Sequence, residues 1–352
     1  PLGSVAPWAR AILFVGACLL LCLWVVRSSL LGRVEVVRTP VWFFVAGYLL
    51  ILCLQLIPLP RFLLAVVSPK AAELYAWLVP GYPGPSGMMS VTMNPHATVQ
   101  EIFRLLTFAI VLFVFLNHFR DRRQIAGVLW ALVAVGLFQA FYGLAEKFSG
   151  DPHIFWIVPR DRVSVHGTYY NRNHFAGLME MLTPAVFGFF LASLATQSRS
   201  WRSTQQGLFQ RIEQALSKGR VYRNLLLGLV VAAMFLAGVL SLSRGGTTGL
   251  LAGFLILFGF TQVRGEKRAR VVRVFVFVLL AALGLLFYRG VEGIVDRFEQ
   301  LSEDDSSWEG RQELRQAGAR MFGDFPLLGV GGGAFKYVFP AYQPERYGNR
   351  VA

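Results

Sequence analysis

Residues 241–246, with the sequence Ser-Leu-Ser-Arg-Gly-Gly, lie where two long apolar runs meet. A charge beside hydrocarbon is costly without a partner, and the planar fork of Arg244 matches the oxygens of a phosphate group. Amide groups at the start of the helix that follows also favour anions. The segment predicts a phosphate clamp built from Arg244 and Ser243, with the two glycines allowing a sharp reversal of the backbone. The alternative is an arginine that extends to the lipid headgroups.

Residues 166–177 form a second polar and aromatic segment, just before another apolar run. Asn171, Asn173 and His174 carry groups that hydrogen-bond sugar hydroxyls. Tyr169 or Tyr170 offers a ring on which a sugar can stack. The alternative is a helix start capped by Asn171 or Asn173, with aromatic side chains at the membrane interface. The residue types alone leave both interpretations open.

The same segment holds candidates for acid–base chemistry and for anion binding. A histidine has its pKa near neutral pH, so His166 and His174 are both candidate general bases. Arg172 lies between the two asparagines and is a further candidate for binding an anionic substrate.

A third segment, residues 306–322, has the spacing of a capping box followed by a helix. Arg311 and Arg315 lie four residues apart on one face of that helix, where like charges repel unless an anion lies beside them. They are candidate substrate-binding residues, and the alternative is a solvated face with nearby glutamates. The glycine-rich residues 324–335 lack the Lys-Ser/Thr of a nucleotide-binding loop and favour a flexible or tightly packed turn.

Eight apolar runs must position these segments. Hydrophobic residues make up 55% of the 352 residues and charged residues only 15%, against about 25% charged in a soluble domain. Each run approaches the ~20 residues that cross a ~30 Å hydrocarbon layer, where the backbone must satisfy its own hydrogen bonds. The sequence therefore predicts an all-α fold, a polytopic bundle of transmembrane helices. The runs span residues 8–26, 40–57, 102–119, 125–145, 175–195, 224–242, 247–263 and 271–288.

Basic residues are distributed unequally between the two sides of this topology. In the connections between runs, seventeen fall on one side and seven on the other. The positive-inside rule makes the richer side cytoplasmic, and it accounts for the net charge of +14 without nucleic acid. The connections 58–100, 146–174 and 243–246 are then outside, together with a large polar loop at 289–352.

Three further expectations concern the ends of the chain and its first outer connection. Residues 1–4 resemble the remnant of a cleaved expression tag, so we leave them out of the fold. The loop 289–352 stops without a closing element, so we expect further C-terminal spans beyond Ala352. Residues 62–79 are apolar but broken by Pro69, which favours an interfacial amphipathic helix.

The order of the polar segments is more specific than any one of them. Asn-x-Asn-His-Phe-Ala-Gly at 171–177 is followed by Ser-Arg-Gly-Gly at 243–246, and Gly-Arg at 310–311 by Phe-Pro-Leu-Leu-Gly-Val-Gly-Gly-Gly-Ala-Phe at 325–335. This series resembles the O-antigen ligase and O-antigen polymerase superfamily of bacterial membrane glycosyltransferases. The resemblance covers residues 169–342, about half of the chain.

The resemblance implies a multi-span enzyme of the glycosyltransferase-C type in the bacterial inner membrane, active at the periplasmic face. Such enzymes take a glycan from undecaprenyl pyrophosphate and pass it to lipid A core, to a growing polysaccharide or to a protein. No cofactor and no essential metal are expected. Arg244 and Arg311 match the arginines that hold the pyrophosphate, and the family's histidine-containing stretch would fall beyond Ala352.

A different function remains open from the residues alone. Many spans and an outward basic cluster are also typical of a transporter or flippase for a lipid-linked or anionic substrate. An ion path needs polar residues near the middle of the bilayer, and Glu180 alone is placed for one. A structural role in an envelope assembly is a third interpretation. The sequence does not distinguish a ligase from a polymerase, which differ in their acceptor.

Overall fold

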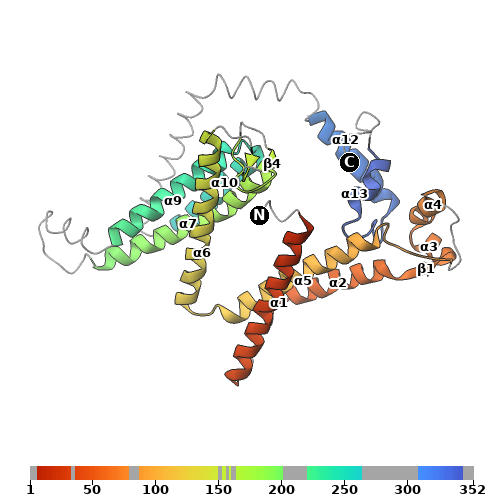
Figure 1. Ribbon diagram of the computed structural model, residues 1–352, viewed down its shortest axis with the longest axis horizontal. Coiled ribbons are helices and arrows are strands. Elements are labelled where there is room, and N and C mark those ends of the chain that lie inside the picture. The colour runs from red at the N-terminus through yellow and green to blue at the C-terminus, as the bar shows by residue number, and fades with distance from the viewer. Residues whose placement is uncertain are drawn as a thin grey trace, which may run out of the picture. The chain divides into compact units, whose positions relative to one another are not determined.

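The computed structural model describes residues 6–32, 36–78, 87–149, 153–155, 158–159, 164–200, 220–263 and 308–343. Helices dominate it, and the few strands are two or three residues long (Figure 1). The prediction of an all-α fold is confirmed. Its elements are α1 (Pro7–Leu30), α2 (Val41–Leu56), β1 (Pro58–Pro60), α3 (Arg61–Val67), α4 (Pro69–Leu78), β2 (Met88–Ser90), α5 (Pro95–His118), α6 (Arg122–Ser149), β3 (His153–Ile154), β4 (Val158–Pro159), α7 (Arg172–Ser200), α9 (Arg220–Leu240), α10 (Arg244–Val263), α12 (Trp308–Asp324), α13 (Phe335–Val338) and the 3₁₀ turn η3 (Phe339–Ala341).

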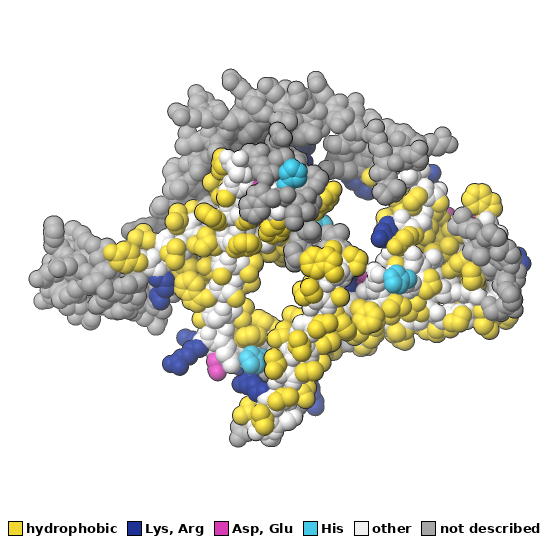
Figure 2. All heavy atoms as spheres, viewed as in Figure 1, with side chains coloured by type: hydrophobic (Ala, Val, Ile, Leu, Met, Phe, Trp, Pro, Cys, Tyr) yellow, Lys and Arg dark blue, Asp and Glu magenta, His cyan; other side chains and the backbone are white. Residues whose placement is uncertain are grey.

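Five helices among the described residues are long and apolar enough to cross a membrane, namely α1, α5, α6, α7 and α9. Two shorter apolar helices accompany them, α2 and the first part of α10. Large apolar side chains face outward along these helices, as Phe43 on α2 and Phe141 on α6 show at 79% and 70% exposure. Figure 2 shows hydrophobic side chains along the helices and Lys and Arg side chains near their ends. Such a surface fits lipid and not water. The predicted span 271–288 lies outside the described residues.

The chain divides into two compact units. Unit 1 contains Pro1–Ala9 and Phe119–Tyr288, and unit 2 contains Arg10–His118 and Arg289–Ala352. The described helices of unit 1 are α6, α7, α9 and α10, which pack as a bundle. Its core includes Phe175, Met179, Phe187, Leu227, Met234 and Leu250.

Helices α7 and α10 run in the same direction and touch along their length. Gly246 near the start of α10 faces Ala176 near the start of α7, and Gly253 further along faces Pro184. A β-carbon on Gly253 would lie only 2.9 Å from Pro184 Cγ. Small residues on one helix face let two backbones approach in this way, as in many membrane proteins.

Helices α6 and α9 run opposite to α7. Near the end of α7, Ser193 Oγ donates a hydrogen bond of 2.6 Å to Asn224 Oδ1 near the start of α9. The ring of Phe189 packs edge-on against Trp130 near the start of α6, with 5.3 Å between centroids. The end of α6, the start of α7, the end of α9 and the start of α10 therefore share one end of unit 1.

Unit 2 contains three of the apolar helices. α1 runs parallel to α5, because Phe14 meets Phe103 at 5.0 Å and Trp24 meets Phe113 at 4.8 Å between ring centroids. α2 runs the other way, with Trp42 near its start 5.9 Å from the same Phe113. The start of α1, the end of α2 and the start of α5 thus lie together.

A small second core covers that end of unit 2. The strand β1 follows α2 directly and pairs antiparallel with β2, Pro58 opposite Ser90 and Pro60 opposite Met88. The predicted interfacial segment 62–79 is two helices, α3 and α4, because Pro69 ends one and opens the other. α12 begins at Trp308, close to the predicted start. The residues that pack together in this second core include Leu64, Tyr75, Val91, Met321 and Phe325.

Candidate functional site

The polar end of unit 1 consists of residues 164–174 and 241–246. It contains eight of the ten predicted site residues.

Asn171 begins helix α7. Its side-chain Oδ1 accepts a hydrogen bond from the amide of Asn173 at 2.8 Å, and its carbonyl accepts those of His174 and Phe175 at 3.1 and 3.2 Å. These contacts satisfy amides that the first turn of a helix leaves without partners. Asn171 therefore serves as the cap that the sequence offered as an alternative to sugar binding. Asn173 and His174 are exposed at the first turn.

The two candidate histidines have different surroundings. His166 is buried, with Nε2 3.0 Å from Ser164 Oγ and Nδ1 3.3 Å from the carbonyl oxygen of Tyr170. Because a carbonyl only accepts, the neutral ring carries its proton on Nδ1 and accepts at Nε2 from the serine hydroxyl. His166 thus stabilises its own loop, whereas His174 is exposed.

Tyr169 is partly packed into the core, and Tyr170 is the more exposed ring. The centroid of Tyr169 lies 6.4 Å from that of Phe175, and burial raises the pKa of its hydroxyl. Tyr170 is 64% exposed at the same end. Of the two, Tyr170 is the better placed for stacking on a sugar.

Gln139 of α6 holds this loop in place. Its Oε1 accepts the amide of Thr168 at 3.0 Å and its Nε2 donates to Thr168 Oγ1 at 2.8 Å. Gly167 has a φ of 53°, and a β-carbon there would lie 2.6 Å from Gln139 Oε1 and 2.7 Å from Phe175. The amide of Val165 donates to the carbonyl of Leu240 at the end of α9, at 2.9 Å. The loop is therefore fixed to three helices.

The second polar segment caps helix α10. Ser243 is buried, and its Oγ accepts the amide of Gly246 at 3.3 Å. The chain reversal falls on Leu242, which has a φ of 55°. The expectation that Gly245 and Gly246 provide the reversal is wrong, because both belong to α10. Gly246 instead allows the close approach of α10 to Ala176.

This approach places the first turns of α7 and α10 side by side. Arg172 is the first residue of α7 and Arg244 the first of α10. Arg172 is half-buried and Arg244 is exposed. Two helix starts with parallel dipoles, each carrying a guanidinium group, create a positive region suited to a phosphate or pyrophosphate.

The remaining candidates lie in unit 2. Arg315 is exposed on α12, and the side chain of Arg311 lies outside the described residues. Arg244 and Arg311 belong to different units. Their joint action on one substrate stays a prediction.

The glycine-rich segment of unit 2 is a tightly packed turn. Gln55, near the end of α2, donates through Nε2 to the carbonyl of Leu328 at 2.6 Å and accepts the amide of Gly332 through Oε1 at 2.9 Å. The carbonyl of Gly332 accepts from Thr98 Oγ1 at 2.9 Å. Gly331, with a φ of 106°, leaves no room for a β-carbon beside Thr92. Of the two interpretations of residues 324–335, the packed one is confirmed.

Sequence reasoning missed Gln55 and Gln139. Both lie inside apolar runs, where a polar side chain needs a partner. Both are buried and bind the backbone of a distant polar segment. The sequence feature that could have identified them is a single glutamine within a predicted transmembrane span.

Residues 229–351 match a family model described as O-antigen ligase. The chain contains an O-antigen ligase domain. This domain covers about a third of the sequence and includes Arg244, Arg311 and the glycine-rich segment. The resemblance read from the polar segments is thereby confirmed, although residues 171–177 fall before the matched region. No curated protein and no solved structure matches the chain.

The O-antigen ligase domain contributes to both units. Its first part forms α10 and most of α9 in unit 1, and its last part includes α12, α13 and η3 in unit 2. The match at residues 229–351 supports glycan transfer of the O-antigen ligase or polymerase type, and the long apolar helices support a multi-pass membrane protein. Lipid-linked glycans and their acceptors are the general class of partner.

Proposed function

We propose that the protein transfers a glycan from undecaprenyl pyrophosphate to lipid A core or to a growing polysaccharide, at the periplasmic face of the inner membrane. The observation that carries the proposal is the pair of adjoining helix starts, α7 with Arg172 and α10 with Arg244, the second within the O-antigen ligase domain.

The distribution of basic residues supports the periplasmic face. The end of unit 1 opposite the polar end carries Arg122 and Arg123 at the start of α6 and Arg223 at the start of α9. The segment between α7 and α9 adds further lysines and arginines. By the positive-inside rule this opposite end is cytoplasmic, so the polar end faces the periplasm.

The arginines assist the departure of the lipid pyrophosphate. An acceptor hydroxyl oxygen forms a bond to the anomeric carbon of the donor sugar while the bond from that carbon to the pyrophosphate oxygen breaks. The pyrophosphate leaves with the bonding electrons, and the hydroxyl proton passes to a base. Arg244, Arg172 and the amides of the two first turns stabilise the negative charge that develops. One well-placed donor of this type contributes about 10²–10³-fold to kcat.

Among the described histidines of the polar end, His174 is the better candidate for the base. It is exposed at the first turn of α7, beside the proposed anion site, whereas His166 has both ring nitrogens directed to its own loop. A general base increases the reaction rate by about 10²–10⁴-fold.

Reconstitution of the purified protein in lipid nanodiscs tests the proposal. The substrates are undecaprenyl-pyrophosphate-linked repeat units and either lipid A core or a polysaccharide primer, and the products measured are the glycosylated acceptor and free undecaprenyl pyrophosphate. We expect transfer by the wild type and a loss of about 100-fold or more in Arg244→Ala. Arg123→Ala, exposed at the opposite end, is the matched control and should behave as wild type.

A nanodisc has no second compartment, so transport cannot produce a glycosylated acceptor in this assay. Failure of the wild type to glycosylate either acceptor, with folded protein, would defeat the proposal and leave the transporter interpretation.

A further inference from the structure

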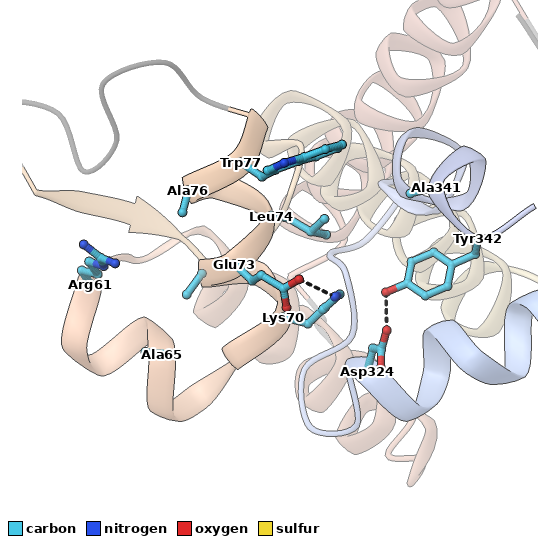
Figure 3. A pocket seen from close by; sticks show the side chains of 11 residues that line it. Arg61, Ala65, Lys70, Glu73, Leu74, Ala76, Trp77, Asp324, Ala341 and Tyr342 are labelled. Carbon is cyan, nitrogen blue, oxygen red and sulfur yellow. Dashed lines mark hydrogen bonds and ion pairs between the residues drawn. The ribbon is translucent and has the colours of Figure 1, made fainter.

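Unit 2 contains a cleft of about 770 Å³, lined only by residues of that unit. One wall comes from α3 and α4, and the other from the end of α12 and from η3 with Tyr342 (Figure 3). Ligand sites typically have volumes of about 300–1,000 Å³. The cleft is large enough for a short oligosaccharide.

Trp77 supplies an aromatic surface to this cleft. Its side chain is 85% exposed although it is among the largest apolar groups of the unit. Figure 3 shows its ring on the α4 side beside Leu74, with the ring of Tyr342 on the opposite wall. An exposed indole has a broad apolar face and one N–H donor. The C–H face of a sugar ring can stack on the apolar face of the indole, and a sugar hydroxyl can accept from its N–H.

Hydrogen-bonding groups in the cleft are held in fixed pairs. The hydroxyl of Tyr342 donates to Asp324 Oδ2 at 2.6 Å, and Lys70 Nζ lies 2.7 Å from Glu73 Oε1. Burial, followed by the bond to Asp324, raises the pKa of the Tyr342 hydroxyl, as expected for a proton held in that bond. Each carboxylate has a second oxygen with acceptor sites for sugar hydroxyls.

The balance of charge selects the class of ligand. Two basic side chains, Arg61 and Lys70, face the cleft with two acidic ones, Glu73 and Asp324. A polyphosphate would meet two carboxylates, and a lipid tail would meet four charged groups, so neither fits. A polyhydroxylated ligand with little net charge matches mixed donors and acceptors beside an aromatic ring.

We propose that this cleft binds a saccharide, namely sugar residues of the glycan or of its acceptor. The inference rests on the proposed function for its biological meaning, because a glycan transferase must hold a long chain at places away from the reacting carbon. Trp77 is then a sugar-stacking residue, and Asp324 and Tyr342 on the opposite wall supply hydrogen-bonding groups to the saccharide.

Direct binding tests the inference. The probe is the lipid-free oligosaccharide released by mild acid from the polysaccharide of the source strain, with the full protein in nanodiscs and saturation-transfer NMR as the readout. We expect Trp77→Ala to raise the Kd about tenfold, the equivalent of one aromatic contact of ~1.4 kcal/mol. Tyr342→Phe should also weaken binding, because it removes a hydroxyl oxygen that can accept from a sugar and the bond that fixes the Asp324 carboxylate.

Phe62→Ala is the matched control. Phe62 is 74% exposed on α3 and does not line the cleft. Equal Kd values for Trp77→Ala and wild type, or no binding by wild type, would overturn the inference. So would equal losses in Trp77→Ala and Phe62→Ala, which would make Trp77 an interfacial lipid anchor.

The outcome separates the inference from the proposed function. Trp77-dependent binding without any transfer by the wild type would support saccharide binding in the cleft and contradict the proposed transferase function. If Trp77→Ala transfers the glycan with an unchanged KM and binds the oligosaccharide with an unchanged Kd, the transferase function is supported and saccharide binding in the cleft is contradicted.

Discussion

Gly246 in the first turn of α10 packs directly on Ala176 in the first turn of α7. A β-carbon on Gly246 would collide with that of Ala176 and approach its Cα within 3.3 Å. The neighbouring Gly245 faces open space. Two adjacent glycines of one motif thus differ in their steric environment, which makes them a natural pair for testing.

Gly246→Ala should separate the two helix starts, lower stability by about 1–3 kcal/mol through overpacking, and reduce transfer. Gly245→Ala should change neither property by a comparable amount. Thermal unfolding in detergent, together with the transfer assay, measures both effects. Equal behaviour of the two variants would contradict the packing described.

Arg244→Lys tests whether the guanidinium geometry matters beyond its charge. A lysine supplies one point charge and cannot form the two parallel hydrogen bonds of an arginine to phosphate. We expect kcat to fall by at least about tenfold in Arg244→Lys. The fall should be larger in Arg244→Ala, about 10²–10³-fold, as for the removal of one oxyanion-hole donor. Because Arg244 is exposed, both variants should retain the unfolding temperature of the wild type. A lysine variant with full activity would argue against bidentate binding.

Gln139→Leu should loosen the loop that precedes α7. The substitution leaves the amide of Thr168 buried without its acceptor, at a cost of about 1–3 kcal/mol. Thr168→Val removes one of the two bonds to Gln139 and should cost less. A double-mutant cycle between these positions should give a coupling of about 0.5 kcal/mol or more. Strictly additive losses would mean that the two side chains act independently.

Gly331→Ala and Gly329→Ala probe the glycine-rich turn of unit 2. Both glycines have a positive φ, 106° and 67°, so alanine strains the backbone at either site. Only at Gly331 does the new methyl group also collide with Thr92, since nothing lies within 4 Å of a β-carbon at Gly329. We expect a loss of about 1 kcal/mol at Gly329 from backbone strain and a clearly larger loss at Gly331. Denaturation monitored by a label near α12 measures the difference.

The fold class was accessible from the sequence because long apolar runs in lipid leave the backbone few options. The family was accessible because the order of the polar segments is specific, and the O-antigen ligase match at residues 229–351 confirms that family. Contacts between distant positions were not accessible. The roles of Gln55 and Gln139 depend on segments 273 and 29 residues away, and no local pattern encodes such pairings.

Local chemistry was also ambiguous where one residue type serves two purposes. Asn171 and Ser243 carry polar groups suited to a substrate, yet both cap helices, which favour the same side chains. Gly246 was expected to turn the chain and instead makes a helix contact, because glycine suits both tasks. Three-dimensional neighbours decide between such roles.

The bonds from Gln55 to Leu328 and Gly332 also constrain the order of biosynthesis. A ribosome delivers α1, α2 and α5 to the membrane long before it reaches residue 328, and the stretch Phe119–Tyr288 of unit 1 emerges in between. Throughout that interval the amide of Gln55 must rely on water, on lipid headgroups or on an insertion factor. Assembly of unit 2 is therefore a late event that waits for the O-antigen ligase domain to be completed.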